Sequence, residues 1–194
     1  DQGKKLVFAK PYYQLENNEL ILRQCPPAKV PIEENDLPNS EKKRIDTGGR
    51  FQLLRKLVVK AGIKELAQKI TKYQPIPEYN SATNPVWLIM RKILENWIFQ
   101  HQKSVILMPI PLYQHVEETC DASAYQERFK ELSKSTGCIL HDPLIDLLKY
   151  TPEQRRKFRF ERDIHLTPEG HEAIAASVAL VIKKILLTQS KEVD

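Results

Sequence analysis

The chain has 194 residues, of which 41% are hydrophobic and 28% charged, and its formal net charge is +5. This length and balance predict one domain with a sizeable hydrophobic core. The basic residues are scattered rather than clustered among aromatics, so they favour a solvated surface over a nucleic-acid interface. No sequence stretch reaches the roughly 18 apolar residues that a membrane-spanning helix needs.

Three cysteines, Cys25, Cys120 and Cys138, are too widely spaced to form a Cys-x-x-Cys pair. An odd number without paired spacing argues against a disulfide framework or a zinc ribbon. Reduced thiols are the default expectation, with a single bridge left open. The sequence begins at Asp1 rather than Met and shows no signal peptide, so a cytoplasmic location is the default and an extracytoplasmic one stays open.

The first half of the chain predicts a hairpin followed by helices. Two apolar segments flank Asn17-Asn18, and asparagine tolerates positive φ, so we expect a β-hairpin over 11–23. The proline-rich stretch 26–40 predicts an irregular connection. A helical insertion is expected over about 41–101, with a loop at 74–83. Its clearest helix begins at Asn84-Pro85 and carries an apolar stripe that we interpret as core: Val86, Ile89, Met90, Ile93, Leu94, Trp97 and Ile98.

The second half predicts strands alternating with helices. The apolar runs 104–111 and 138–142 suit buried strands, and a helix over 122–136 between them should end at Gly137. A short helix at 144–148 and a charged linker at 151–159 follow. This order favours a parallel sheet with helices on both faces, in which ligands bind at the carboxyl ends of the strands.

An acid and a histidine two residues apart, Asp163 and His165, precede the last helix. Thr167 is its expected N-cap and Pro168 its first residue. A carboxylate next to an imidazole can fix the tautomer of the ring and stabilise its protonated form. Asp163 and His165 are therefore the candidate catalytic residues, whereas His171, within the helix, is expected to be structural.

The segment 163–171, Asp-Ile-His-Leu-Thr-Pro-Glu-Gly-His, resembles the last conserved block of the SGNH/GDSL hydrolase superfamily. The hairpin sequence over 11–23 also resembles one found in a bacterial branch of that superfamily. The resemblance implies a flavodoxin-like α/β three-layer sandwich that hydrolyses acyl esters, without a metal or organic cofactor. It implies that His165 is the base and Asp163 its orienting acid. The spacing Asp-x-His, with Arg162 in place of the more usual acid, is similar to an acetyltransferase-like branch.

The other blocks of that superfamily are absent from the sequence. No serine lies in a Gly-Asp-Ser block, and the glycine and asparagine donors of the oxyanion hole are also missing. We therefore expect residues 1–194 to be the C-terminal part of a single SGNH-like domain. The N-terminal part of the hydrolase, on the same or a separate chain, would be its partner, and its substrate would be a small-molecule, lipid or carbohydrate ester.

Three alternatives stay open. The chain could be a catalytically degenerate SGNH-like binding module, or an O-acyltransferase-like protein. Asp163 and His165 could also form an ordinary surface loop near a helix N-terminus. The pair His141-Asp142 is typical of metal-dependent phosphohydrolases, but those are all-helical, whereas this pair ends an apolar run.

Overall fold

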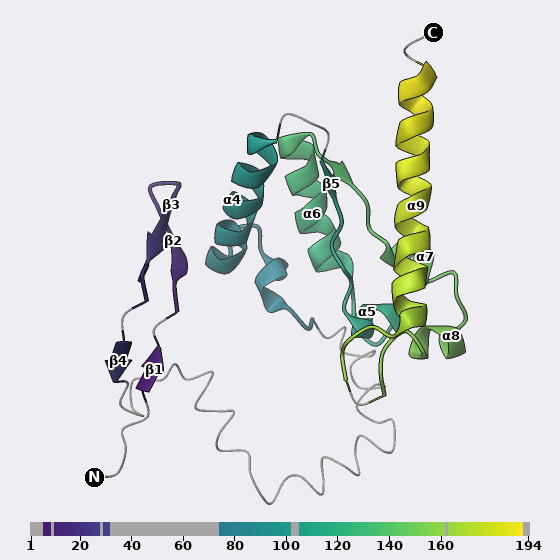
Figure 1. The fold of residues 1–194 in the computed structure, drawn as a ribbon, viewed down its shortest axis with the longest axis horizontal. Helices are drawn as coiled ribbons and strands as arrows, with labels where there is room; N and C mark the ends of the chain where they lie inside the picture. Colours follow the sequence, from purple (N-terminus) through teal and green to yellow (C-terminus); the bar gives the residue numbers. More distant parts are fainter. Residues whose placement is uncertain are drawn as a thin grey trace, which may run out of the picture.

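The computed structural model describes residues 6–8, 10–27, 29–31, 74–101, 105–161 and 163–191. The helices expected within 42–73, and Arg162, lie outside these residues. The described strands are β1 (Leu6–Phe8), β2 (Tyr12–Glu16), β3 (Glu19–Arg23), β4 (Lys29–Pro31), β5 (Ile106–Leu107) and β6 (Ile139–Leu140). The described helices are η2 (Pro77–Asn80), α4 (Pro85–Gln100), α5 (Tyr113–Val116), α6 (Ser123–Thr136), α7 (Leu144–Leu147), α8 (Pro152–Arg156) and α9 (Pro168–Lys191) (Figure 1).

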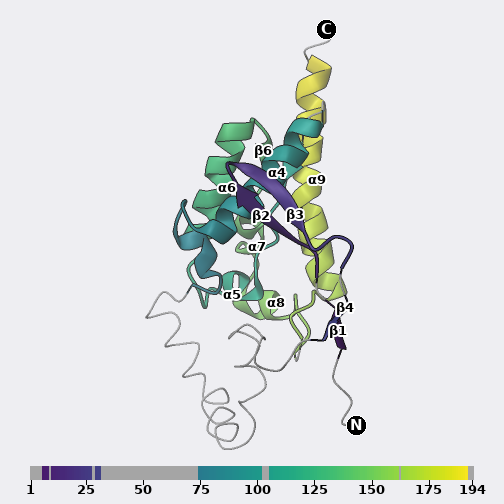
Figure 2. The same cartoon turned by 90° about the vertical axis from the view of Figure 1, so that its left-hand side faces the viewer.

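Strands β2 and β3 form the antiparallel hairpin expected over 11–23. Tyr12 pairs with Arg23, and Asn17 and Asn18 make the turn with φ angles of 49° and 64°. The hairpin lies against α4 (Figure 2). Strands β1 and β4 make a second antiparallel pair. The expectation of an irregular connection over 26–40 is therefore wrong at β4.

Strands β5 and β6 are parallel, as the alternation of helices and strands predicts. Ile106 pairs with Ile139 and Leu107 with Leu140, and α5 and α6 lie in the connection between the two strands. Each strand has only two residues, which is shorter than either apolar run predicts. In Figure 1, α4 and α6 lie to one side of this pair and α9 to the other. The described chain is thus a mixture of helices and two-stranded sheets, one of them parallel.

The hydrophobic core includes buried side chains of α4 and α6 and extends to α7 and α9. Leu132 is 0% exposed and Trp87 is 1% exposed, and the ring of Trp87 packs edge-on against Phe129 at 5.8 Å between centroids. Helix α6 ends as predicted at Gly137, which adopts a left-handed φ of 74°. The predicted stripe of α4 is only partly core, because Val86 and Trp97 are exposed whereas Trp87, outside the stripe, is buried.

The stretch 151–159, expected to be a charged linker, contains the short helix α8. Thr151 and Gln154 form a reciprocal capping box at the start of α8, which supplies partners for backbone N–H groups that would otherwise be unpaired. Pro152 occupies the first turn. Helix α8 turns Arg155 into the interior, where the residue is only 6% exposed. The expected loop at 74–83 likewise contains the short helix η2.

Helix α9 is the longest described helix, with 24 residues. Ala173, Ile174 and Ser177 face the core, whereas Leu180, Ile182 and Leu186 are exposed. Within the part of the chain that the structure describes, no helix combines the length and the apolarity that a bilayer crossing requires.

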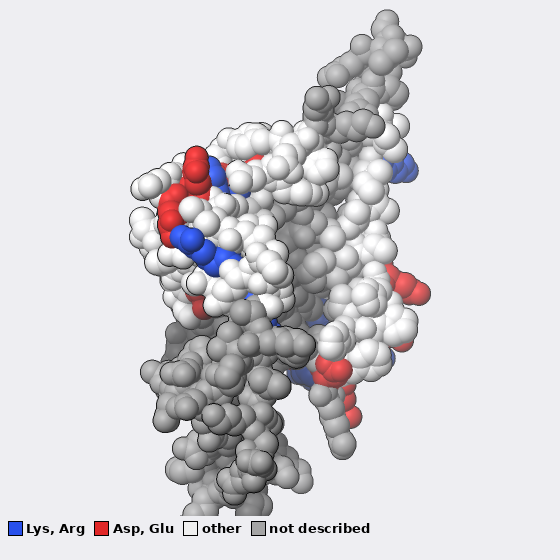
Figure 3. Space-filling model, turned by 60° about the vertical axis from the view of Figure 1, so that its left-hand side comes forward, with Lys and Arg blue, Asp and Glu red and all other residues white. Residues whose placement is uncertain are grey.

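Exposed apolar side chains are also numerous on α4 and the hairpin: Tyr12, Tyr13, Leu22, Val86, Ile93, Trp97 and Phe99. Much of the described surface in Figure 3 carries neither acidic nor basic residues. A group of exposed apolar side chains, as on α4 and the hairpin, is typical of an interaction surface.

Truncation of Leu132 tests this core. Leu132→Ala should lower the free energy of unfolding by about 2–5 kcal/mol, because it removes a fully buried side chain and leaves a cavity. Lys130→Ala, exposed on the same helix, should change it by less than about 0.5 kcal/mol. Urea titration of both variants makes the comparison, and equal effects would place Leu132 outside the core.

Candidate active site

The loop before α9 is closed by backbone pairing between the residues at its two ends. Arg159 and Leu166 form an isolated antiparallel bridge, and the Phe160 N–H donates to the His165 carbonyl at 3.2 Å. Thr167 adds a second connection, since its Oγ1 donates to the Lys157 carbonyl at 2.6 Å. The short loop between Phe160 and His165 is therefore held at both ends.

Thr167 and Gly170 bring the first turn of α9 against the backbone of Phe158. The Thr167 N–H donates to the Phe158 carbonyl at 3.0 Å, and Thr167 Oγ1 accepts from the Gly170 N–H at 3.3 Å. A Cβ atom on Gly170 would lie 2.3 Å from the Phe158 carbonyl oxygen. Glycine is thus required by this approach between two backbones.

Within the loop, Asp163 and His165 form a direct pair. His165 Nδ1 lies 2.6 Å from Asp163 Oδ1, and the His165 backbone N–H donates to the same oxygen at 3.2 Å. An ionised carboxylate can only accept, so Nδ1 carries a proton, and in the neutral ring Nε2 then presents a lone pair. The side chains of His165 and Asp163 are 78% and 54% exposed, so Nε2 is accessible to a group that approaches from solvent or from another segment.

The pair also alters the acidity of the carboxyl group. Hydrogen bonds from the His165 side chain, and then from its backbone, lower the pKa of Asp163 below its ordinary value. The carboxylate therefore stays ionised at neutral pH, the state in which it orients a histidine.

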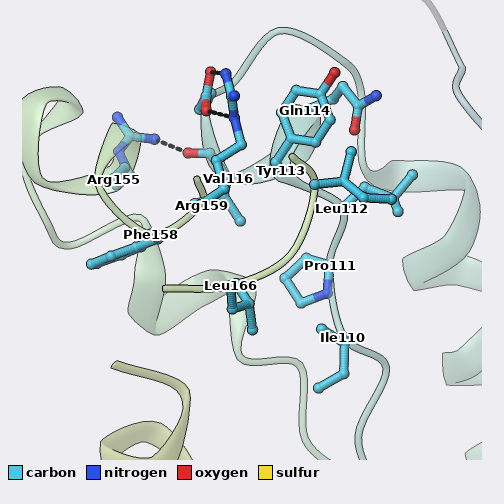
Figure 4. Close-up of a pocket in the computed structure, with 12 residues that line it drawn as sticks. Ile110, Pro111, Leu112, Tyr113, Gln114, Val116, Arg155, Phe158, Arg159 and Leu166 are labelled. Atoms are coloured by element: carbon cyan, nitrogen blue, oxygen red, sulfur yellow. Dashed lines mark hydrogen bonds and ion pairs between the residues drawn. The ribbon is translucent and has the colours of Figure 1, made fainter. Parts of the chain in front are cut away.

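A cavity of about 360 Å³ adjoins the loop. Figure 4 shows its walls, with Ile110, Pro111 and Leu112 from the segment after β5 facing Phe158 and Leu166. Ile164 also lines it. The two chain neighbours of His165 thus contribute to the cavity, which lies beyond the carboxyl end of β5, where ligands bind in parallel sheets.

The charged residues in the cavity wall are engaged in ion pairs. Glu117 accepts from Arg159 Nε at 2.6 Å and from Arg159 Nη2 at 3.3 Å. Arg155 donates to the Val116 carbonyl at 2.7 Å (Figure 4). It also donates to Glu118 at 2.6 Å. These contacts tie α8 and the loop to the turn after α5, and so fix the shape of the cavity.

A second group has the composition of a triad but a different arrangement. Ser177 Oγ donates to Asp146 Oδ2 at 2.6 Å and lies 2.7 Å from His141 Nε2. Ser177 is 2% exposed, in the middle of α9. The hydroxyl proton points to the acid rather than to the histidine, and the serine is enclosed, so the group joins β6, α7 and α9 rather than presenting a nucleophile.

Among the described residues, no serine bonds to His165 and no group of side chains near the pair could hold a metal. The ring of His165 has no serine among its hydrogen-bond partners there. Neighbouring His141 and Asp142 bond separately, the latter with Tyr125, Gln126 and the Leu144 N–H. Over the same ranges, no three His, Cys, Asp or Glu side chains form a group that could hold a metal.

The sequence motif thus identifies two residues that the structure brings together, Asp163 and His165, but not their surroundings. The contributions of Arg155, Arg159 and Glu117 depend on contacts across about 40 positions of sequence separation. The capping signature Thr-x-x-Gln at 151–154 could have predicted α8 from the sequence, and with it that Arg155 lies in a helix.

The hydrogen bond between Asp163 and His165 predicts that the pKa of the Asp163 carboxyl group depends on the His165 side chain. In His165→Ala the pKa of Asp163 should rise towards its ordinary value but not fully reach it, because the backbone N–H still donates. Because the pKa of Asp163 is lowered in the folded state, the pair stabilises the fold at pH values above the ordinary carboxyl pKa. This stabilisation is lost as the pH falls through the lowered pKa. Carboxyl 13C NMR titration measures the pKa of Asp163 in this variant, with His171→Ala as control. An unchanged pKa of Asp163 in His165→Ala would exclude the side-chain hydrogen bond.

The contact at Gly170 predicts the sign of a stability change. Helix propensity alone would make Gly170→Ala stabilising by about 1 kcal/mol. The clash with the Phe158 carbonyl should instead lower the free energy of unfolding by about 1–3 kcal/mol. Thermal and urea unfolding measure it, beside Glu172→Ala on the exposed side of the same turn; a more stable Gly170→Ala would contradict the close approach.

No family model matches the chain, and no curated protein or solved structure is significantly similar to it. Its chemistry therefore has to be inferred from its own residues. The central observation is an aspartate–histidine pair in a clamped loop, beside an apolar cavity.

Proposed function

We propose that this chain is the part of an SGNH-type acyl-ester hydrolase that supplies His165 as the general base and Asp163 as its orienting acid. The observation that carries the proposal is the 2.6 Å contact between His165 Nδ1 and Asp163 Oδ1. It leaves Nε2 as the proton acceptor, and the high exposure of the ring leaves room for a serine hydroxyl.

The motif residues around the pair support the proposal because each has a physical task. Thr167 caps α9 and bonds to the Lys157 carbonyl, and Gly170 permits the contact with Phe158. A clamped loop loses little further conformational freedom when the base engages a substrate, which is what a positioned catalytic group requires.

The sheet supports a larger fold than the described residues form. Strand β5 pairs only with β6 in the described part of the chain, which leaves its other edge without a strand. An unpaired edge beside exposed apolar side chains is a surface that a further strand can cover. We propose that strands bearing the serine, glycine and asparagine complete a three-layer sandwich here, from the same chain or a separate one.

In the proposed mechanism, His165 Nε2 takes the proton of the serine hydroxyl as its oxygen attacks the ester carbonyl. The imidazolium formed is stabilised by the Asp163 carboxylate and then gives its proton to the leaving alcohol. Water repeats the sequence on the acyl-enzyme and releases the acid. Should an alcohol replace water in this second half, the same residues would transfer the acyl group, the O-acyltransferase alternative.

Mutation of the pair tests the proposal in the natural gene product that contains these residues. His165→Ala should lower kcat/KM for a 4-nitrophenyl ester by about 10³–10⁶-fold, because nucleophile and base act as a unit. Asp163→Asn should lower it by about 10²–10⁴-fold by disturbing the tautomer. The matched histidine control, His171→Ala, should have little effect, since its side chain is exposed and lies in a different turn.

A fluorophosphonate probe separates the enzyme from a degenerate binding module. The proposal expects one labelled serine in the natural gene product, and slower labelling in His165→Ala. No labelled serine together with no ester turnover would favour the binding module. Full activity of His165→Ala would exclude the assigned base.

A further inference from the structure

We propose that the cavity beside the catalytic loop, lined by Ile110, Leu112, Phe158, Ile164 and Leu166 among others, binds the acyl chain of the substrate, and that this chain is uncharged and of medium length. The inference rests on the proposed function, since it assigns the ester carbonyl to His165. It goes further by naming the substrate class: esters of medium-chain fatty acids rather than acetyl esters.

The cavity lies next to the loop that holds His165. Ile164 and Leu166 both line it, and they are the residues on either side of His165. Consecutive Cα atoms are about 3.8 Å apart, so a group in the cavity lies within a few ångströms of the loop that holds the imidazole. His165 itself does not line the cavity, so the acyl chain of an ester whose carbonyl is at His165 would enter this space past Ile164 or Leu166.

The charges of the wall carry the second step. Glu117 is paired with Arg159, whose guanidinium also lies 4.5 Å from the centre of the Tyr113 ring. Arg155 is paired with Glu118 and bonded to the Val116 carbonyl. Both arginines are therefore already paired with carboxylates, although the buried Nε of Arg155 has no hydrogen-bond partner among the described residues. An ionised acyl group would enter a mostly apolar space in which neither cation is unpaired, which is unfavourable.

The size of the cavity carries the third step. A volume of about 360 Å³ falls in the range of small-molecule sites. An acetyl group would leave most of it empty and forgo contacts with Leu112, Phe158 and Leu166. Each additional buried methylene improves binding by about fourfold, so the preference should rise steeply with chain length until the cavity is full.

The experiment compares 4-nitrophenyl octanoate with 4-nitrophenyl acetate in the natural gene product. The ratio of kcat/KM, octanoate over acetate, should be at least about 100, given six more methylenes. Ile110→Trp, which enlarges a side chain at the cavity, should lower this ratio at least tenfold. Ile145→Trp is the matched control, since Ile145 is also an exposed isoleucine, lies on α7 and lines no part of this cavity, and it should leave the ratio unchanged.

A binding measurement uses 1-octanol as a neutral probe with the His165→Ala variant, which removes turnover. Methyl NMR signals of Leu112, Ile164 and Leu166 should shift on titration, and Ile110→Trp should weaken this binding at least tenfold. Turnover of both esters with a ratio near one, or a ratio that Ile110→Trp leaves unchanged, would overturn the acyl assignment alone. The acyl assignment would also be overturned if 1-octanol shifted only the NMR signals of other methyl groups, which is the result expected if protein side chains fill the cavity. Turnover of neither ester would overturn the proposed function with it.

Discussion

The backbone of Phe158 and the first turn of α9 approach each other so closely that a single added carbon at Gly170 would collide with a carbonyl oxygen. This contact sets where α9 begins, and so where the preceding loop must end. Thr167 bonds on both sides of it, to the Lys157 carbonyl and to the Gly170 N–H. The backbone around His165 is thus positioned by main-chain contacts at the start of α9, whereas its ring is oriented by Asp163.

Two different scales of structure meet at the candidate site. The pair Asp163–His165 is local, with both hydrogen bonds spanning two residues, so its geometry needs little beyond the loop itself. The cavity beside it is tertiary, because its walls come from the segment after β5, from α8 and from the loop. The candidate acid–base pair is therefore formed by near neighbours in the sequence, whereas the cavity beside it is formed by distant elements.

That division explains what could be predicted from the sequence. The hairpin turn at Asn17-Asn18, the start of α4 at Asn84, the end of α6 at Gly137 and the Asp163–His165 pair depend on near neighbours, and short patterns identify them. The burial of Trp87 and the ion pair between Glu117 and Arg159 depend on distant contacts, and no such pattern identifies them. The wider sandwich stays a proposal, since only β5 and β6 represent its parallel sheet in the described chain.

The bonding of Ser177 assigns a tautomer to a second histidine. Since the single hydroxyl proton of Ser177 goes to Asp146, the Ser177 oxygen can meet His141 only as an acceptor, so His141 must be protonated on Nε2. His165, bonded through Nδ1, is protonated on the opposite nitrogen. The two imidazoles therefore donate hydrogen bonds from opposite ring nitrogens, which their 15N shifts can distinguish. Of the two, only His165 has an Nε2 without a hydrogen-bond partner among the described residues.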